Sequence, residues 1–380
     1  SPTVHKVNVE WTEKSKDRPL SKRVVKLARI PDELRTLPEM LAETGMGTSA
    51  VVNNVFLSPG GGMERGFDHY DHERASFRSY RDAREVTDIA RAWLEKRGDA
   101  PYFALVHYFD PHVPYWAPEP YRDRYARGAR GRVDPHSYRQ FKEIKDGPLE
   151  LTEEEREYLR GLYEAEVRFA DDEIKRLVTW LEERGDLERT WLVITADHGE
   201  EFWEHGGFEH GHAFENEVTR APLIVRAPGG EWGAGHRVST NARHIDIFPT
   251  FTDLFGIDPP SQLEGSSLIP LVRGEETAPR PTMIERNIGM PRRYAYYDGR
   301  FKIELHHRGD EGHLYDLAND PREQRRLGRE HPQFSRLEKA AERYRRVLLR
   351  AKRKIKSETE MHRLSDDMAE ALENLGYVGD

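Results

Sequence analysis

The sequence contains no cysteine, which excludes a disulfide scaffold, a thiolate zinc site and a cysteine nucleophile within the chain. No apolar run approaches the roughly 20 residues that a helix needs to span a bilayer. The 59 basic residues are outnumbered by 68 acidic ones, and the net charge of -9 argues against a dedicated nucleic-acid binder. The hydrophobic share is only 37%, but 16 Tyr, 15 Phe and 7 Trp supply enough material for a folded core.

The length of 380 residues suits one large α/β domain with a smaller appendage. The chain starts at Ser1 rather than Met and carries no signal peptide, so we expect this start to be a cut end. The location of the protein, cytoplasmic or exported, and its oligomeric state are left open by the sequence.

Capping boxes predict where two helices begin, Thr36 with Glu39 and Thr152 with Glu155. A further helix is expected over residues 82–97, because its apolar residues recur on one face and Gly98 follows them. The helix after Thr152 is expected to bury one apolar stripe, made of Leu159, Leu162, Tyr163, Val167, Ala170, Ile174, Leu177, Val178 and Leu181.

Strands are expected at the apolar runs 48–52, 102–108, 191–196 and 222–226. The second of these is apolar enough to be buried on both faces. Helices that alternate with buried strands predict an α/β fold, with a mostly parallel sheet flanked by helices on both faces.

The tail changes character near residue 280. Residues 293–307 are expected to form two antiparallel strands around the turn Asp298-Gly299, and residues 333–356 an amphipathic helix. We therefore predict an α/β catalytic domain over residues 1–279 and a smaller C-terminal α+β subdomain, with hairpin and helix, over residues 280–380.

Asp197 and His198 follow the strand 191–196 directly, where the ligand crevice of an open α/β sheet lies. A carboxylate suits Ca²⁺ or Mg²⁺ and an imidazole suits Zn²⁺ or Mn²⁺, so the pair is a candidate metal site. The alternative is that Asp197 caps the next helix beside a histidine with an ordinary structural role.

Other histidines lie on loops that the same reasoning brings to the crevice. His112 stands between Pro111 and Pro114 and can donate to an anionic ester or protonate a leaving group, or else simply bond to the backbone. His210 and His212 alternate with glycines that let the backbone approach a substrate closely. A zinc site made of these histidines is the rival interpretation, although their spacing matches no strict zinc signature.

Six segments, taken together, resemble the sulfatase family of the alkaline phosphatase superfamily in order and spacing. They are HYFDPHVPY (107–115), TADHGEE (195–201), EVTRAPLI (217–224), HIDIFPT (244–250), LYDLANDP (314–321) and LGYV (375–378). The resemblance runs from about residue 36 to the end of the chain.

This resemblance implies one divalent cation, usually Ca²⁺ with Mg²⁺ or Mn²⁺ as alternatives, for which Asp197 and His198 supply half of the ligands. It implies that His112 contacts the sulfate or the leaving oxygen. Many relatives have a Lys at or next to His210, and the alignment leaves open whether His210 or His212 faces the substrate. Asn54 stands where many arylsulfatases carry a cationic clamp, and it can hydrogen-bond an anion without adding charge.

The family nucleophile, in a Cys/Ser-x-Pro-x-Arg motif that matures to formylglycine, is missing from this sequence, and so are the first metal-binding carboxylates. Residues 1–5 resemble the stretch that follows that motif, so we expect an N-terminal piece with the nucleophile to precede Ser1. The chain alone is then expected to be inactive and to lack the central strands of its sheet.

The resulting hypothesis is a fragment of a metal-dependent sulfuric-ester hydrolase whose substrate is a small-molecule or carbohydrate sulfate ester. Two alternatives stay open. One is a phosphodiester or phosphonate monoester hydrolase of the same superfamily, with Asp110 helping to hold a second ion. The other is a non-catalytic relative.

Overall fold

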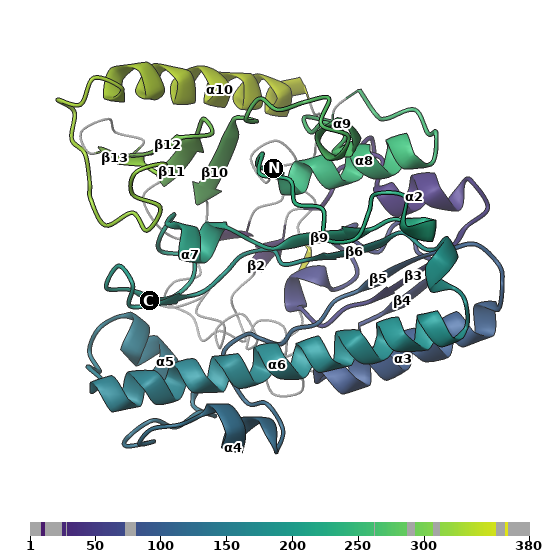
Figure 1. The fold of residues 1–380 in the computed structure, drawn as a ribbon, viewed down its shortest axis with the longest axis horizontal. Helices are drawn as coiled ribbons and strands as arrows, with labels where there is room; N and C mark the ends of the chain where they lie inside the picture. The colour runs from purple at the N-terminus through teal and green to yellow at the C-terminus, as the bar shows by residue number, and fades with distance from the viewer. Residues whose placement is uncertain are drawn as a thin grey trace. The chain divides into compact units, whose positions relative to one another are not determined.

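A computed structural model describes residues 9–11, 25–27, 29–72, 81–261, 263–286, 293–306, 312–354 and 362–363. Figure 1 draws the helices and strands of these residues as a ribbon. The described residues form two compact units: the first comprises residues 9–186 with 362–363, and the second comprises residues 187–354. The expectations for residues 1–5, 307, 355–356 and 375–378 fall outside the described part. The predicted domain boundary at residue 279 stays a prediction.

The first unit contains the parallel sheet that the sequence predicts. Its strand order is β4-β3-β5, and both pairings are parallel, with β4 spanning His69–Asp71, β3 Gly47–Val51 and β5 Tyr102–Val106. A small antiparallel sheet joins β1 (Val9–Trp11), β2 (Val25–Leu27) and β14 (His362–Arg363). All five residues of β3 are buried, as expected for the central strand of three.

Three helices of the first unit, α2 (Leu37–Ala42), α3 (Ala83–Arg97) and α6 (Glu153–Glu183), begin where the sequence predicts. The other helical elements of this unit are the 3-10 turn η3 (Val55–Leu57), α4 (Tyr121–Tyr125) and α5 (Tyr138–Lys145). The capping boxes of Thr36 and Thr152 both form, and a third forms between Asp82 and Glu85. Helix α3 packs on β3 and β5, with Val86 and Ala90 against Val51, and α6 packs on α3.

Two details of this unit differ from the sequence-based expectation. Val167 of α6 is 42% exposed, because the buried stripe runs instead through Glu166 and Glu173, two charged positions. Leu105 of β5 is 41% exposed, so one face of β5 is not covered at this residue. The predicted burial of β5 on both faces is therefore not what the described residues show.

The second unit begins with an antiparallel strand pair, β6 (Leu192–Thr195) with β9 (Leu223–Arg226). Between them the chain forms the short hairpin of β7 (Glu201–Phe202) and β8 (Phe208–Glu209). The helical elements of this part are η4 (Leu187–Arg189), α7 (Asn216–Thr219), η5 (Pro228–Gly230), η6 (His244–Asp246), α8 (Ile247–Leu254) and α9 (Ile269–Val272).

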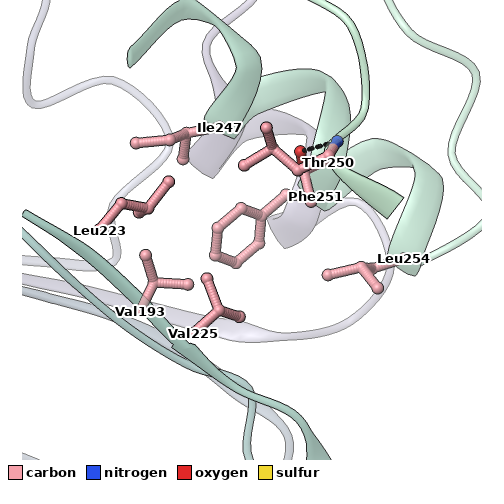
Figure 2. Close-up of a pocket in the computed structure, with 8 residues that line it drawn as sticks. Val193, Leu223, Val225, Ile247, Thr250, Phe251 and Leu254 are labelled. Atoms are coloured by element: carbon pink, nitrogen blue, oxygen red, sulfur yellow. Dashed lines mark hydrogen bonds between the residues drawn. The ribbon is translucent and has the colours of Figure 1, made fainter. Parts of the chain in front are cut away.

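Helix α8 covers one face of the β6–β9 pair (Figure 2). Phe251 and Leu254 of α8 face Val193 and Val225 around an apolar cavity of about 10 Å³. This volume is that of about one water molecule, so the cavity is a packing defect of the core and not a ligand site.

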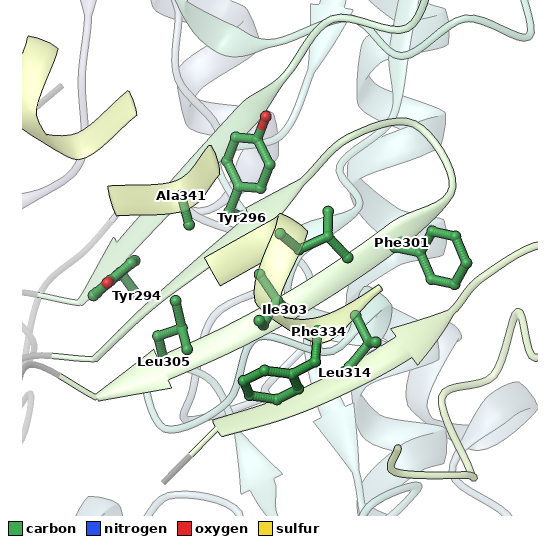
Figure 3. Close-up of a cluster of buried hydrophobic side chains, with 9 residues drawn as sticks. Tyr294, Tyr296, Phe301, Ile303, Leu305, Leu314, Phe334 and Ala341 are labelled. Atoms are coloured by element: carbon green, nitrogen blue, oxygen red, sulfur yellow. The ribbon is translucent and has the colours of Figure 1, made fainter. Parts of the chain in front are cut away.

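The predicted C-terminal hairpin is confirmed and is part of a four-stranded antiparallel sheet. The sheet runs in the order β10 (Thr282–Arg286), β11 (Arg293–Tyr297), β12 (Phe301–His306) and β13 (Gly312–Asp316). Gly299 makes the β11–β12 turn at a φ of 105°, where a glycine is required. Helix α10 (Phe334–Lys354) covers the sheet and buries Phe334, Leu337 and Ala341 against it (Figure 3).

Among the described helices, none combines the length and the apolar character that a membrane span requires.

Candidate active site

Asp197 and His198 lie directly after β6, at its carboxyl end. The Asp197 side chain is 82% exposed and that of His198 is 36% exposed, so neither is packed into the core. Asp197 Oδ1 accepts the backbone N–H of His198 at 3.0 Å, and its Oδ2 lies 3.6 Å from His198 Nε2. The two adjacent side chains thus turn one oxygen and one nitrogen toward the same point.

This pair fits a divalent cation in a specific respect. His198 Nδ1 donates to the carbonyl of Gly199 at 2.9 Å, which places the ring proton on Nδ1 and the lone pair on Nε2. The lone pairs of Nε2 and of Asp197 Oδ2 therefore converge, as two ligands of one ion do. Within the described residues no cluster of three or more His, Asp or Glu side chains could hold a metal, so this pair supplies only part of a ligand set.

His210 lies beside this pair. Its ring centroid is 4.1 Å from that of His198, and its Nδ1 donates to Glu200 Oε1 at 2.8 Å. The Glu200 side chain is 4% exposed, so a buried carboxylate orients the His210 ring. Asp197, His198 and His210, three of the predicted site residues, are therefore brought together.

His212 is held by a different carboxylate. Its Nε2 donates to Glu201 Oε2 at 2.7 Å, while Glu201 Oε1 accepts the backbone N–H groups of His205 and Gly207 at 3.0 and 2.8 Å. The Glu201 side chain is 1% exposed. Burial alone would raise its pKa, but the hydrogen bonds from His212, Gly207 and His205 outweigh burial and lower the pKa of Glu201.

Two glycines are needed for this arrangement. A Cβ on Gly207 would lie 2.1 Å from His212 Nε2, and a Cβ on Gly199 would lie 2.1 Å from the carbonyl oxygen of Glu217. Any side chain at Gly207 would therefore break the contact between Glu201 and His212. The sequence shows these glycines, but their partners depend on the register of the β7–β8 hairpin.

In the first unit, His112 lies on the loop that follows β5. Its Nδ1 donates to the carbonyl of Val113 at 2.8 Å, and its ring stacks on Phe109 with centroids 4.5 Å apart. The neutral ring thus carries its proton on Nδ1 and its lone pair on Nε2.

Asn54 lies in the first unit, at the start of η3. Its Oδ1 accepts the N–H of Phe56 at 2.9 Å in an Asx turn, which leaves the amide nitrogen as the group that can donate to an anion. Its predicted role in substrate binding stays a prediction.

Sequence reasoning missed the buried carboxyl of Glu166, considered Asp110 only as a ligand of a second ion, and assigned no role to Glu200 and Glu201. Burial raises the pKa of Asp110 to about 7, and the neighbouring Asp82 charge adds to the rise. Burial also raises the pKa of Glu166, with the Asp110 charge as the second cause. The signal for Glu166 was available, because it stands on the same face of the helix as Leu159 and Leu162.

Two family models match the chain. The one described as sulfatase matches residues 11–257, and the one described as N-sulphoglucosamine sulphohydrolase, C-terminal, matches residues 203–345. The first match covers well over half of the sequence. The protein belongs to the sulfatase family, within the alkaline phosphatase superfamily.

Curated relatives agree with this assignment. The chain is 32% identical over 268 residues to the "uncharacterized sulfatase YidJ" of Escherichia coli. The aligned residues cover 64% of this chain and 51% of that protein. It is 35% identical over 177 residues to the N-acetylglucosamine-6-O-sulfatase of Bacteroides thetaiotaomicron, which is 44% of this chain and 31% of that enzyme. The chain thus spans about half the length of these relatives or less.

Solved structures share the fold. One is a protein in complex with its substrate D-glucosamine-2-N,6-O-disulfate, with a TM-score of 0.67 and 20% identity over 93% of this chain and 88% of that chain. Another is a phosphonate monoester hydrolase from Silicibacter pomeroyi, with a TM-score of 0.68 and 19% identity over 92% of this chain and 83% of that chain. At this identity both confirm the α/β fold and nothing finer.

Proposed function

We propose that the complete protein of which this chain is a part hydrolyses sulfate esters at a site that holds one divalent cation. The observation that carries the proposal is the convergence of Asp197 Oδ2 and His198 Nε2, 3.6 Å apart, beside the His210 ring. Ca²⁺ is the proposed ion because it prefers oxygen ligands, and the carboxylate of Asp197 is the more exposed ligand of the pair. Mg²⁺ and Mn²⁺ are the alternatives. An ion bound there would polarise the sulfate oxygens.

His112 and His210 are the proposed catalytic residues. A protonated His112 can give the Nε2 proton to the leaving oxygen, because its Nδ1 is engaged with the Val113 carbonyl. His210, oriented by Glu200, can donate to the anionic oxygens of the ester. Between the two loop histidines, the geometry supports His210 as the one that faces substrate, since Glu201 binds His212 Nε2.

The nucleophile of the proposed reaction, a formylglycine or serine, is not contained in this sequence, which has no cysteine and no Ser-x-Pro-x-Arg motif. The chain by itself is accordingly expected to be inactive. For the substrate we propose a sulfated sugar, supported by the 35% identity with the N-acetylglucosamine-6-O-sulfatase.

The experiment is a comparison of substrates with the complete protein. We expect an aryl sulfate and a sulfated glucosamine to be turned over, turnover to stop on chelation, and Ca²⁺ to restore it. Turnover of an aryl phosphonate monoester at a higher kcat/KM than the aryl sulfate would contradict the proposal.

That outcome would favour the second candidate, a phosphonate monoester hydrolase with two ions. One observation weighs against it. Asp110, the side chain proposed for a second ion, is only 6% exposed and accepts the backbone N–H of Ala83.

A further inference from the structure

Two buried carboxyl groups are associated with the loop that carries His112, one on the loop itself and one on α6. Asp110 precedes His112 by two residues and is 6% exposed, while Glu166 comes from α6 and is 0% exposed. One oxygen of each, Asp110 Oδ2 and Glu166 Oε2, has no hydrogen-bond partner among the described residues. Buried polar atoms are rarely left in this state without a reason.

Glu166 binds the loop at two points. Its Oε1 accepts the backbone N–H of Trp116, and the carboxyl group also accepts the backbone N–H of His112. Pro111 and Pro114 have no N–H to offer, so Glu166 takes two of the four donors between residues 111 and 116. A single side chain therefore fixes the backbone on both sides of the cis bond between Val113 and Pro114.

Among the described residues, no positive side chain is found to act on the two carboxyls. The groups that face Asp110 are its own N–H, the N–H of Ala83 at the start of α3, and the Asp82 carboxylate. Those that face Glu166 are Asp110 and the loop N–H groups. No Lys or Arg in the described part forms an ion pair with either, and two adjacent buried negative charges without a cation are costly.

We propose that Glu166 is a positioning residue for His112: it is protonated at its unpartnered oxygen, and its other oxygen holds the backbone of residues 112–116 in place. The inference rests on the proposed function, because that function gives His112 its catalytic role. It adds to that function the group that holds the imidazole in position. A proton on Glu166 leaves the two buried carboxyls with one negative charge instead of two.

The direction of the pKa shifts agrees with a protonated Glu166. Burial, with the Asp82 charge, raises the pKa of Asp110 to about 7. Burial, with the Asp110 charge, raises the pKa of Glu166 as well. A raised carboxyl pKa means that the folded state binds more protons than the unfolded state above about pH 4. The loop is therefore expected to lose stability as the pH rises from that value toward 7.

The first test is spectroscopic and needs no turnover. The Cε1–H signal of His112 is assigned by its loss in His112→Gln and then followed in Glu166→Ala, Glu166→Gln and Glu173→Ala. Glu173 is the matched control, since it lies seven residues further on the same face of α6, is 6% exposed, and pairs with Arg84 and Arg176. We expect the signal to shift and broaden in Glu166→Ala only, because the Gln side chain of Glu166→Gln keeps the oxygen that accepts the loop N–H groups. An unchanged His112 signal in Glu166→Ala would overturn the proposal.

A second measurement reads the proton itself and remains available if Glu166→Ala does not fold. The infrared C=O band of a buried protonated carboxyl should be present at neutral pH in the wild type and missing in Glu166→Gln. Persistence of the band in Glu166→Gln would refute the proton on Glu166.

Kinetics on the complete protein then separate this inference from the proposed function. Glu166→Ala should lower kcat on an aryl sulfate by about 10–100-fold with little change in KM, as expected for a misplaced catalytic group. Glu166→Gln should restore most of it. If His112→Gln has no effect on kcat, the proposed function is wrong, while the histidine spectrum still decides whether Glu166 positions the ring.

Discussion

The two histidine-bearing segments of this protein are held by carboxyl groups in opposite ways. After β5, Glu166 accepts a hydrogen bond from the backbone of the His112 loop, and the imidazole of His112 is bonded to a backbone carbonyl. After β6, Glu200 and Glu201 bind the imidazoles of His210 and His212 themselves. The first arrangement fixes where the ring lies and the second fixes how the ring is turned. A proton donor needs its ring nitrogen for the substrate, whereas an anion-binding histidine benefits from a carboxylate that orients it.

The segments also differ in what surrounds the carboxyls. Asp110 and Glu166 each keep one oxygen without a hydrogen-bond partner and their pKa values rise, whereas Glu201 receives three hydrogen bonds and its pKa falls. Burial is common to both places. The hydrogen-bond donors within reach therefore decide the direction of the shift.

The largest effect is expected on turnover, from removal of the imidazole rings of His112 and His210. His112→Ala in the complete protein should lower kcat/KM for an aryl sulfate by about 10²–10⁴-fold, the range for a positioned proton donor, with little change in Tm. His210→Ala should act similarly but with a larger share in KM, because its proposed role is to hold the ester oxygens. Steady-state kinetics and thermal melting measure both.

The control for these variants is His236→Ala, at an exposed position of the second unit. It should match the wild type in both measurements. Full turnover in both His112→Ala and His210→Ala would show that neither loop belongs to the active site.

A smaller effect, on stability, is expected at Glu201. Glu201→Ala removes the acceptor of two backbone N–H groups and of His212, and it should lower the free energy of unfolding by about 2–3 kcal/mol. Because the folded-state pKa is lowered, this contribution is fully present above the unfolded pKa of about 4.3 and is lost as the pH falls through the folded value.

Denaturant unfolding at pH 7 and at pH 3 measures that difference. The gap between Glu201→Ala and the wild type should be wide at the higher pH and narrow at the lower one. A gap that does not change with pH would mean that the charge of Glu201 is irrelevant to the fold of this segment.

The smallest effect is expected from His212→Ala. This change removes one bond to a carboxylate that keeps two backbone donors, so we expect a loss of about 1 kcal/mol in stability and a change in kcat/KM of less than about 10-fold. Steady-state kinetics on His212→Ala and His210→Ala show which of the two histidines contributes more to turnover. If His212→Ala is the more damaging to turnover, the roles of the two histidines are exchanged.

Much of the fold could be predicted because its signals are local. The capping boxes at Thr36 and Thr152, the Asp298-Gly299 turn and the apolar spacing of α10 each depend on residues within a few positions of one another. The same local reasoning placed Asp197 and His198 at a strand end. Strand partners are a long-range property, and so the antiparallel pairing of β6 with β9 could not be read from two apolar runs.

The exact partners of the site residues could not be predicted either. The bonds of His210 to Glu200 and of His212 to Glu201 follow from the register of a hairpin with two-residue strands. The position of Glu166 in the buried stripe of α6 was missed for a different reason. A helix face was read by its apolar residues, and a carboxyl group is buried among them because it accepts N–H groups from a loop far away in the sequence.

The most direct test of the proposed function is the metal content of the complete protein, by elemental analysis of the wild type and of Asp197→Ala, with Asp253→Ala as an exposed control on α8. We predict one equivalent of a divalent cation, Ca²⁺ first, in the wild type and in the control, and loss of both the ion and the turnover of an aryl sulfate in Asp197→Ala. Stoichiometric metal and full turnover in Asp197→Ala would contradict the proposed site.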